Sequence, residues 1–213
     1  MNSVLIMGAS RGIGLAAVKR SLASGHRVRA FARSAGQIAM DDPNLEKRAG
    51  NARDPTDVSA ALDGVDVVIQ ALGIAAGPSM VFGLVDLFSG ATRILIPAME
   101  EANVRRLICV TGFGAGDSRD HIGCLQRIPF QIVFGRAYGD KDIQERIIRE
   151  STLDWVIARP GVLTNGPETG RYQILTEPRQ WRNGIISRAD VADFLVRQVE
   201  DDSYLGKTPV LVN

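Results

Sequence analysis

Three glycines separate the first apolar run of the chain from the first stretch in which apolar residues recur at helical spacing. The apolar run covers 4–7, the glycines are Gly8, Gly12 and Gly14, and the helical spacing covers 12–23. A glycine at the first position permits a tight turn, one at the second lets a pyrophosphate approach the backbone, and one at the third lets the helix pack closely on the strand. Free N–H groups at the start of the helix attract phosphate. The spacing therefore predicts a strand-turn-helix unit that binds a dinucleotide.

Short β-branched runs alternate with longer helical patterns along the whole chain, which is typical of a parallel sheet with connecting helices. The expected strands cover 4–7, 27–33, 45–50, 65–72, 105–111, 155–159 and 209–212. The expected helices cover 12–23, 54–64, 81–103, 141–150 and 187–199. The run at 65–72 is nearly all apolar, as in a strand that is covered on both faces. These patterns predict an α/β fold with a doubly wound, mostly parallel sheet and helices on both faces.

Length, composition and charge narrow the class of protein. The 213 residues, of which 45% are hydrophobic and 23% charged, fit a single globular domain over 1–213. We expect the stretch at about 160–190 to contribute the substrate pocket. The formal net charge of +1 provides no field that attracts nucleic acid or a membrane surface, so the expected partner is a small-molecule substrate. A monomer and a homodimer both stay open.

The sequence predicts no targeting segment, no membrane span and no metal site. No basic stretch precedes an apolar run at the N-terminus, and the apolar runs are too short to cross a membrane, which predicts a cytoplasmic protein. Cys109 and Cys124 lack metal-ligand spacing to each other or to His26 and His121. Because Cys109 lies within an apolar run, a small buried side chain is favoured over a reactive thiol.

The end of the second expected strand indicates which dinucleotide is bound. NAD-selective domains usually carry a carboxylate here that holds the ribose 2′-hydroxyl, but this sequence reads Ala32-Arg33-Ser34. Arg33, together with Arg11 from the glycine loop, can pair with a 2′-phosphate through charge-assisted hydrogen bonds. NADP(H) is therefore favoured over NAD(H), unless Arg33 is only a solvated residue at the strand end. Ser10 is a further candidate for a phosphate contact.

Four short motifs outside the glycine loop carry a family resemblance. They are Gly-Asn-Ala-Arg-Asp at 50–54, Ala-Leu-Gly at 71–73, a strand that runs into Arg-Pro-Gly-Val-Leu at 153–163, and Ser-Arg-Ala-Asp-Val-Ala at 187–192. Their order resembles the short-chain dehydrogenase/reductase superfamily, specifically its atypical NAD(P)-binding branch. That branch includes biliverdin/flavin reductase-like enzymes and regulator-like NADP sensors. The resemblance covers nearly the whole chain and implies a Rossmann-type fold.

The resemblance also implies where the cofactor lies along the chain. It places Asn51 and Ala52 beside adenine, 71–73 along the cofactor, and Pro160 and Val162 on the nicotinamide side. With the loop and the candidate catalytic residues included, the expected cofactor-binding residues are Gly8, Ser10, Arg11, Gly12, Ile13, Gly14, Arg33, Asn51, Ala52, Ala71, Leu72, Gly73, Thr111, Lys141, Pro160 and Val162. The chain departs from the branch in having Arg11 where a glycine is common.

The candidate catalytic residues are Thr111, Tyr138 and Lys141. Typical enzymes of the superfamily use a Tyr-x-x-x-Lys pair preceded by a serine, and the lysine lowers the tyrosine pKa so that it protonates a carbonyl oxygen. Here Tyr138 and Lys141 are one residue closer in sequence, so their side chains need not share a helical face. Thr111 stands near the place expected for the serine. The alternatives are a strand-end threonine, a packed loop tyrosine and an ordinary lysine in the first turn of a helix.

Two further segments are candidates for substrate contact. The segment 113–139 carries the apolar residues Ile128, Phe130, Ile132, Val133 and Phe134. These either cover a substrate pocket, pack as an edge helix on the core, or form a dimer interface. Trp181, in a polar stretch, is either a substrate contact or a loop anchor.

The function these observations favour is an NADP(H)-dependent oxidoreductase. Without the usual tyrosine–lysine spacing, hydride transfer to a flavin, quinone or carbonyl-like acceptor that needs little proton assistance is favoured. One alternative is a non-catalytic NADP(H)-sensing regulatory protein. The other is an NAD(P)-dependent epimerase or isomerase, which consumes no net cofactor.

Overall fold

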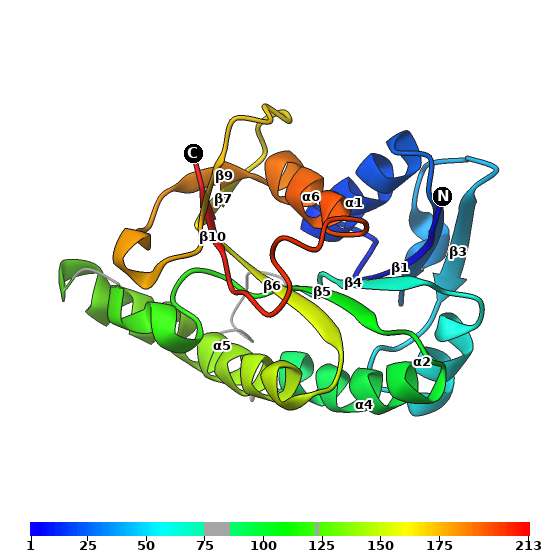
Figure 1. Cartoon of the computed structure of the whole chain (residues 1–213), viewed down its shortest axis with the longest axis horizontal. Helices are drawn as coiled ribbons and strands as arrows, with labels where there is room; N and C mark the ends of the chain where they lie inside the picture. Colours follow the sequence, from blue (N-terminus) through cyan, green and yellow to red (C-terminus); the bar gives the residue numbers. More distant parts are fainter. Residues whose placement is uncertain (75–85, 122–123) are drawn as a thin grey trace.

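The computed structural model shows a central β-sheet with helices on both faces (Figure 1). It describes residues 1–74, 86–121 and 124–213, without the side chains of 120–136. The strands are β1 (Ser3–Met7), β2 (Arg27–Ala32), β3 (Leu45–Ala49), β4 (Val67–Gln70), β5 (Arg106–Val110), β6 (Asp154–Pro160), β7 (Val162–Thr164), β8 (Gln173–Leu175), β9 (Ile185–Ser187) and β10 (Val210–Val212). The α-helices are α1 (Gly12–Ala23), α2 (Pro55–Leu62), α4 (Leu87–Glu101), α5 (Cys124–Glu150) and α6 (Arg188–Arg197). Short 3-10 helices cover Ala35–Gln37, Gly116–His121 and Pro178–Gln180.

The eight strands of the main sheet lie in the order β3-β2-β1-β4-β5-β6-β10-β8, and β7 pairs with β9 in a separate two-stranded sheet. All neighbours in the main sheet are parallel except β10 and β8. The strand order reverses between β1 and β4, and in such sheets a ligand lies outside the carboxyl ends of the strands at this point. The predicted doubly wound, mostly parallel α/β fold is confirmed, and its crevice lies where the glycine loop follows β1.

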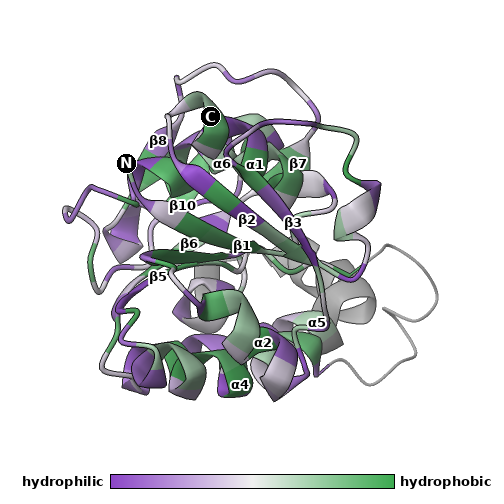
Figure 2. Cartoon of the chain, turned by 90° about the vertical axis from the view of Figure 1, so that its right-hand side faces the viewer, coloured by the Kyte–Doolittle hydropathy of each residue, from purple (hydrophilic) through white to green (hydrophobic). Residues whose placement is uncertain are grey.

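Two layers of helices enclose the sheet, with α1 and α6 on one face and α2, α4 and α5 on the other (Figure 1). Alternate residues of β1 serve the two layers: Val4 and Ile6 join the core with α1 and α6, and Leu5 and Met7 join the core with α2 and α4. All four side chains are fully buried, and each contributes about 1.5–3 kcal/mol by leaving water. Figure 2 shows the hydrophobic central strands between the two helical layers.

The starts of the helices follow from local side chains. The Asp54 carboxylate accepts hydrogen bonds from the backbone N–H groups of Thr56 and Asp57, and Pro55 fills the first position of α2. Ser187 accepts a hydrogen bond of 2.9 Å from the N–H of Asp190 at the start of α6. Both predicted caps are confirmed.

The main difference from the sequence prediction concerns α5. A helix was expected over 141–150, whereas α5 begins at Cys124, so most of the presumed loop at 113–139 is helical. Pro129, Gly135 and Gly139 weaken the helical pattern of the sequence here, and tertiary packing overrides their low propensity. The predicted roles of the apolar side chains at 128–134 lie outside the described side chains, as do residues 81–85 of the helix expected at 81–103. Among the helices that the structure describes, none has the length and apolar character needed to cross a bilayer.

Candidate functional site

The glycine loop is shaped by close contacts that only glycine permits. Gly8 has φ +85°, and a Cβ there would lie 2.5 Å from the carbonyl oxygen of Ala71 at the end of β4. A Cβ on Gly14 would lie 2.2 Å from the carbonyl oxygen of Gly8. Gly12 has φ +59°, and in the described part of the chain only one arginine atom lies within 4 Å of its Cβ position. The first and third glycines therefore allow close packing, and the second leaves open space beside the backbone.

The start of α1 keeps its positive end available for an anion. Arg11 occupies the N-cap position in extended conformation, and no side chain caps the helix. Arg11 and Gly12 are exposed, while Ser10 and Ile13 are partly exposed at the same turn. Uncapped N–H groups and the helix dipole together favour phosphate at this position.

The carboxyl end of β2 presents an arginine without a counter-charge. Arg33 is exposed directly after β2. Arg29 and Arg48, on β2 and β3, form ion pairs with Glu46 at 2.6 and 3.7 Å. No carboxylate in the described ranges pairs with Arg33, so its charge is available to a ligand.

The turns after β3 and β4 complete this half of the crevice. The side-chain oxygen of Asn51 accepts a hydrogen bond of 3.1 Å from the N–H of Arg53, which fixes the turn after β3. Ala52 is buried against the core beneath α2 and α4. The N–H of Ala71 bonds to the carbonyl oxygen of Met7 at 2.9 Å, and Leu72 and Gly73 follow at the same edge of the sheet. The structure thus brings the predicted adenosine-side residues to one edge, and their contact with cofactor stays a prediction.

The three candidate catalytic residues lie together at the end of β5. The Lys141 ammonium donates to the backbone carbonyl of Thr111, and it lies 5.0 Å from the Phe88 ring centroid and 5.4 Å from that of Tyr138. Burial lowers the pKa of Lys141 to about 8 and raises the pKa of Tyr138 to about 12. The Thr111 hydroxyl donates to Glu145 at 2.7 Å. This arrangement supplies a half-buried, titratable ammonium at the carboxyl end of the sheet.

The expectation that Tyr138 lies in a loop is wrong, because α5 begins before it. Tyr138 and Lys141 are both on α5 and share a face, since residues three apart are neighbours on a helix. Lys141 is likewise in the middle of the helix and not in its first turn. The electrostatics still differ from the typical pair, because burial holds the pKa of Tyr138 above its usual value.

Behind Lys141 lies a buried charge network that the sequence analysis missed. The fully buried guanidinium of Arg159 donates to both carboxylate oxygens of Glu145, at 3.0 and 2.5 Å. It also forms an ion pair of 2.6 Å with Asp117. A charged residue inside the apolar strand at 155–159 was the available signal, because such residues are buried only with a partner. The network joins α5 to β6 beside the candidate catalytic residues.

Trp181 packs against this network. The Arg159 guanidinium lies 5.1 Å from the Trp181 ring centroid, and the indole N–H donates to the carbonyl oxygen of Leu175 at 3.0 Å. The side chain is buried, with 7% exposed. Trp181 is therefore a loop anchor, which was one of the two expected roles, and it does not face substrate.

Asp140 is a second residue that the sequence analysis missed. Its buried carboxylate accepts hydrogen bonds from the N–H groups of Phe88, at 2.8 Å, and Ser89, at 3.3 Å. These contacts fix the first turn of α4 against α5. Asp140 thereby positions the Phe88 ring against the Lys141 ammonium.

The strand ends at 160–164 lie beside the segment that follows β5 and the candidate catalytic residues. The carbonyl oxygen of Pro160 accepts a hydrogen bond of 2.9 Å from the N–H of Phe113. Val162 pairs with Ile185 across β7 and β9, and these side chains are 56% and 58% exposed. Such exposure leaves two adjacent apolar side chains available to a ligand.

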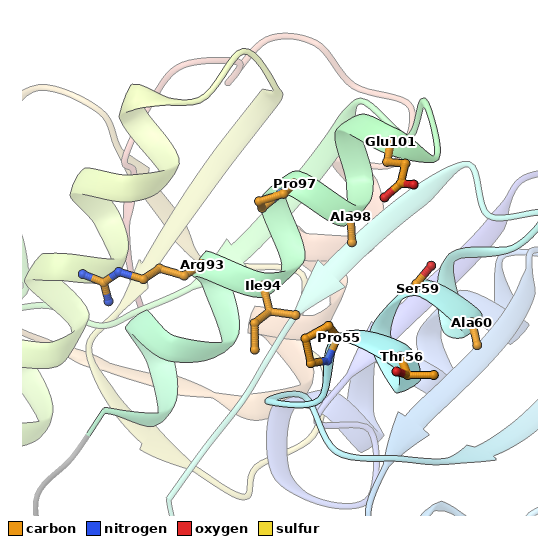
Figure 3. Close-up of a pocket in the computed structure, with 9 residues that line it drawn as sticks. All are labelled: Pro55, Thr56, Ser59, Ala60, Arg93, Ile94, Pro97, Ala98 and Glu101. Atoms are coloured by element: carbon orange, nitrogen blue, oxygen red, sulfur yellow. The ribbon is translucent and has the colours of Figure 1, made fainter.

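Two other features lie apart from this crevice. Figure 3 shows a surface hollow between α2 and α4, lined in part by Pro55, Ile94 and Pro97, and it contains none of the predicted site residues. Among the described side chains no group of three or more histidine, cysteine or acidic residues could hold a metal ion. Cys109 is buried as predicted, and burial raises the pKa of its thiol.

A family model described as NAD(P)H-binding matches residues 8–202, so the chain belongs to this NAD(P)H-binding family. The expected membership of an NAD(P)-binding family is confirmed. The chain is 26% identical over 214 residues to the photosystem II assembly factor Ycf39 of Synechocystis, which aligns with 96% of this chain. This chain spans 60% of the length of Ycf39.

Two further similarities cover most of this chain and most of the protein it is compared with. The chain is 29% identical over 198 residues to the uncharacterized sugar epimerase YhfK of Bacillus subtilis, with 87% of this chain and 85% of YhfK aligned. The solved structure of ChuY from Escherichia coli O157:H7, described as an anaerobillin reductase, is similar with a TM-score of 0.81 at 27% identity. That similarity covers 99% of this chain and 96% of ChuY.

Proposed function

We propose that this protein is an NADP(H)-dependent reductase that transfers a hydride to a flavin, quinone or other carbonyl-like acceptor. The observation that carries the proposal is the half-buried Lys141 ammonium at the same sheet edge as the glycine loop. Hydride transfer to a carbonyl-like acceptor needs two parts. One is a loop that binds phosphate, and the other is a titratable group beyond the neighbouring strands. The similarity to ChuY, described as a reductase, supports the same reaction class.

The residues of the crevice fit a nicotinamide dinucleotide. Gly12 leaves room for a pyrophosphate beside the uncapped start of α1. Arg33, exposed and without a carboxylate partner in the described part of the chain, is suited to a 2′-phosphate. We therefore assign NADP(H) as the cofactor, with the adenosine half over β2 and β3 and the nicotinamide half over β4 to β6.

The bound cofactor supplies the hydride, and the chain supplies orientation and a proton. Lys141 is protonated below its pKa of about 8, so at neutral pH it can donate a proton to an acceptor oxygen or nitrogen. Tyr138 is a weaker acid than a free phenol, because its pKa is raised to about 12. We accordingly assign the proton to Lys141, with the Tyr138 ring packed against its side chain.

The apolar pair Val162 and Ile185 is proposed as part of the substrate pocket. These exposed side chains lie within the stretch 160–190. Val162 directly follows the Arg-Pro-Gly segment at the end of β6, and Ile185 is its partner on β9. When a flat conjugated acceptor packs on such residues, its apolar surface is removed from water, which favours binding. In this proposal the chain 1–213 forms one cofactor-binding domain, and this stretch selects the acceptor.

Cofactor consumption tests the proposal and separates it from the alternatives. We would follow NADPH absorbance with purified protein and a panel of flavins, quinones and carbonyl compounds, with Lys141→Met as the matched variant. We expect turnover with at least one acceptor, and a large loss in the variant. Cofactor binding without turnover on the whole panel would contradict the reductase assignment and favour a sensing protein. Interconversion of a sugar without net NADPH loss would favour the epimerase, the reaction for which YhfK is named.

A further inference from the structure

Arg188, the first residue of α6, has its side chain beside the glycine loop. A Cβ placed on Gly12 would lie 3.9 Å from Nε of Arg188. Apart from the neighbouring residues of Gly12 and the backbone of its own helix, no other atom in the described part of the chain comes within 4 Å. The open side of the middle glycine therefore faces a guanidinium. This is the space that the proposed function assigns to the cofactor pyrophosphate.

The charge of Arg188 is not neutralised within the described ranges. Its Nη1 donates to the side-chain oxygen of Asn165 at 2.8 Å, and no carboxylate forms an ion pair with it. By contrast, Arg20 on α1 and Arg197 on α6 form ion pairs with Asp193, at 3.0 and 2.9 Å. The remaining donors of Arg188 are thus left for an anion on the side of Gly12.

Asp190, two residues further along α6, does not supply the missing charge. Its carboxylate accepts hydrogen bonds from the Ser187 hydroxyl and from the backbone N–H groups of Thr169 and Gly170. These contacts use both oxygens of the carboxylate and join the start of α6 to the segment at 169–170.

The position of α6 shows which part of a dinucleotide Arg188 would meet. α1 and α6 lie side by side on one face of the sheet (Figure 1). The start of α6 follows β9 directly, and β9 pairs with β7, the strand that continues from the end of β6. Arg33, in contrast, follows β2. Arg188 therefore lies on the nicotinamide side of the glycine loop, opposite to Arg33.

We propose that Arg188 binds the pyrophosphate of the dinucleotide at the phosphate nearer the nicotinamide. The proposal rests on the cofactor site of the proposed function and adds a residue to it. NADP(H) and NAD(H) share this phosphate, so Arg188 strengthens the binding of both cofactors equally. Arg33 contacts the 2′-phosphate, which NAD(H) lacks, and so discriminates between them. Asn165 is a positioning residue that holds the guanidinium toward Gly12.

Titration of Arg188→Met with intact and truncated nucleotides tests this assignment. The probes are NADP⁺, NAD⁺ and adenosine 2′,5′-bisphosphate, which lacks the second phosphate of the pyrophosphate. We expect Arg188→Met to bind both intact cofactors about 10- to 100-fold more weakly and by the same factor, because a hydrogen bond to a charged group is lost. Binding of the bisphosphate should stay within about twofold of the wild-type value, since the contacted phosphate is absent from it.

Three matched variants complete the experiment. Arg27→Met removes an exposed arginine at the amino end of β2, whereas Arg33 follows the carboxyl end. This variant should bind every probe as the wild type does. Arg188→Lys keeps the charge and should recover part of the affinity. Asn165→Ala should weaken binding of the intact cofactors by a smaller factor. Circular dichroism checks folding, which we expect to be unchanged because the Arg188 side chain makes one hydrogen bond, to Asn165, and no ion pair within the described ranges.

The outcomes separate this inference from the proposed function. Wild-type affinity for NADP⁺ in Arg188→Met would overturn the inference while leaving the cofactor site intact. An equal loss of affinity for the bisphosphate would also overturn it, because Arg188 would then contact the adenosine-side phosphates. Failure of the wild-type protein to bind any of the three probes would overturn the cofactor assignment itself.

Discussion

The two halves of the proposed cofactor crevice are built in different ways. The adenosine half, from the glycine loop to Arg33, depends on backbone geometry and exposed turns, and its closest contacts involve Gly8, Gly14 and Ala71. The nicotinamide half depends on side chains from distant elements, among them Lys141 on α5 and Arg159 on β6. The first half is thus a rigid phosphate cradle, and the second is a buried charge network whose chemistry can be tuned. Substitutions in the two halves should fail in different ways.

The largest effect is expected from breaking the buried network. Glu145→Gln keeps the shape of the side chain but leaves the buried Arg159 guanidinium without its bidentate partner. We expect the free energy of unfolding to fall by about 3–5 kcal/mol, which urea denaturation measures. Asp117→Asn is the control, because Asp117 is half-exposed and its ion pair is worth about 1 kcal/mol or less. Equal losses of unfolding free energy in the two variants would show that burial of the carboxylate does not determine how much each ion pair contributes to stability.

The next largest effect concerns catalysis in the nicotinamide half. We expect Lys141→Met to lower kcat about 100-fold, the lower end of what a positioned proton donor contributes, while the exposed Lys19→Met leaves it unchanged. Burial lowers the Lys141 pKa from 10.5 to about 8, so proton donation is lost as pH rises through about 8 and is retained below. The wild-type kcat should therefore fall above this pH. A kcat that rises through the same range would show that the neutral amine is the active form.

A pair of glycine variants tests the adenosine half. Gly14→Ala puts a Cβ 2.2 Å from a backbone oxygen, so α1 must shift and the free energy of unfolding should fall by about 2–3 kcal/mol. Gly12→Ala meets no such contact and should cost only about 1 kcal/mol from its left-handed φ. Gly12→Ala should nevertheless weaken NADPH binding, because its methyl group occupies the phosphate space. Thermal unfolding and cofactor titration measure the two effects, and an equally stable Gly14→Ala protein would contradict the packing argument.

The sequence predicted the adenosine half well because its structure is local. A glycine spacing, a strand end and the caps at Asp54 and Ser187 each depend on neighbouring residues, and their geometry is as predicted. The alternation of strand and helix patterns along the chain likewise predicted a mostly parallel sheet. The roles assigned to these residues in cofactor binding stay predictions.

The nicotinamide half was harder to predict because it depends on contacts between distant elements. Tyr138 was expected in a loop, since glycines and a proline hide the first part of α5 in the sequence. Nothing in the sequence pairs Glu145 with Arg159, although a charged residue in a buried strand signals that some partner exists. Arg188 was part of a recognised motif, but only the packing of α6 beside α1 brings its guanidinium to Gly12.

The most direct test of the account is the affinity of the wild-type protein and Arg33→Ala for NADPH and NADH, measured by titration under the same salt conditions. We predict that the wild-type protein binds NADPH more tightly, and that Arg33→Ala loses roughly 10- to 30-fold in NADPH affinity with little change for NADH, because one charge-assisted contact to the 2′-phosphate is removed. Equal affinities in the wild-type protein, or a preference for NADPH that survives in Arg33→Ala, would contradict the assignment of Arg33 and of NADP(H).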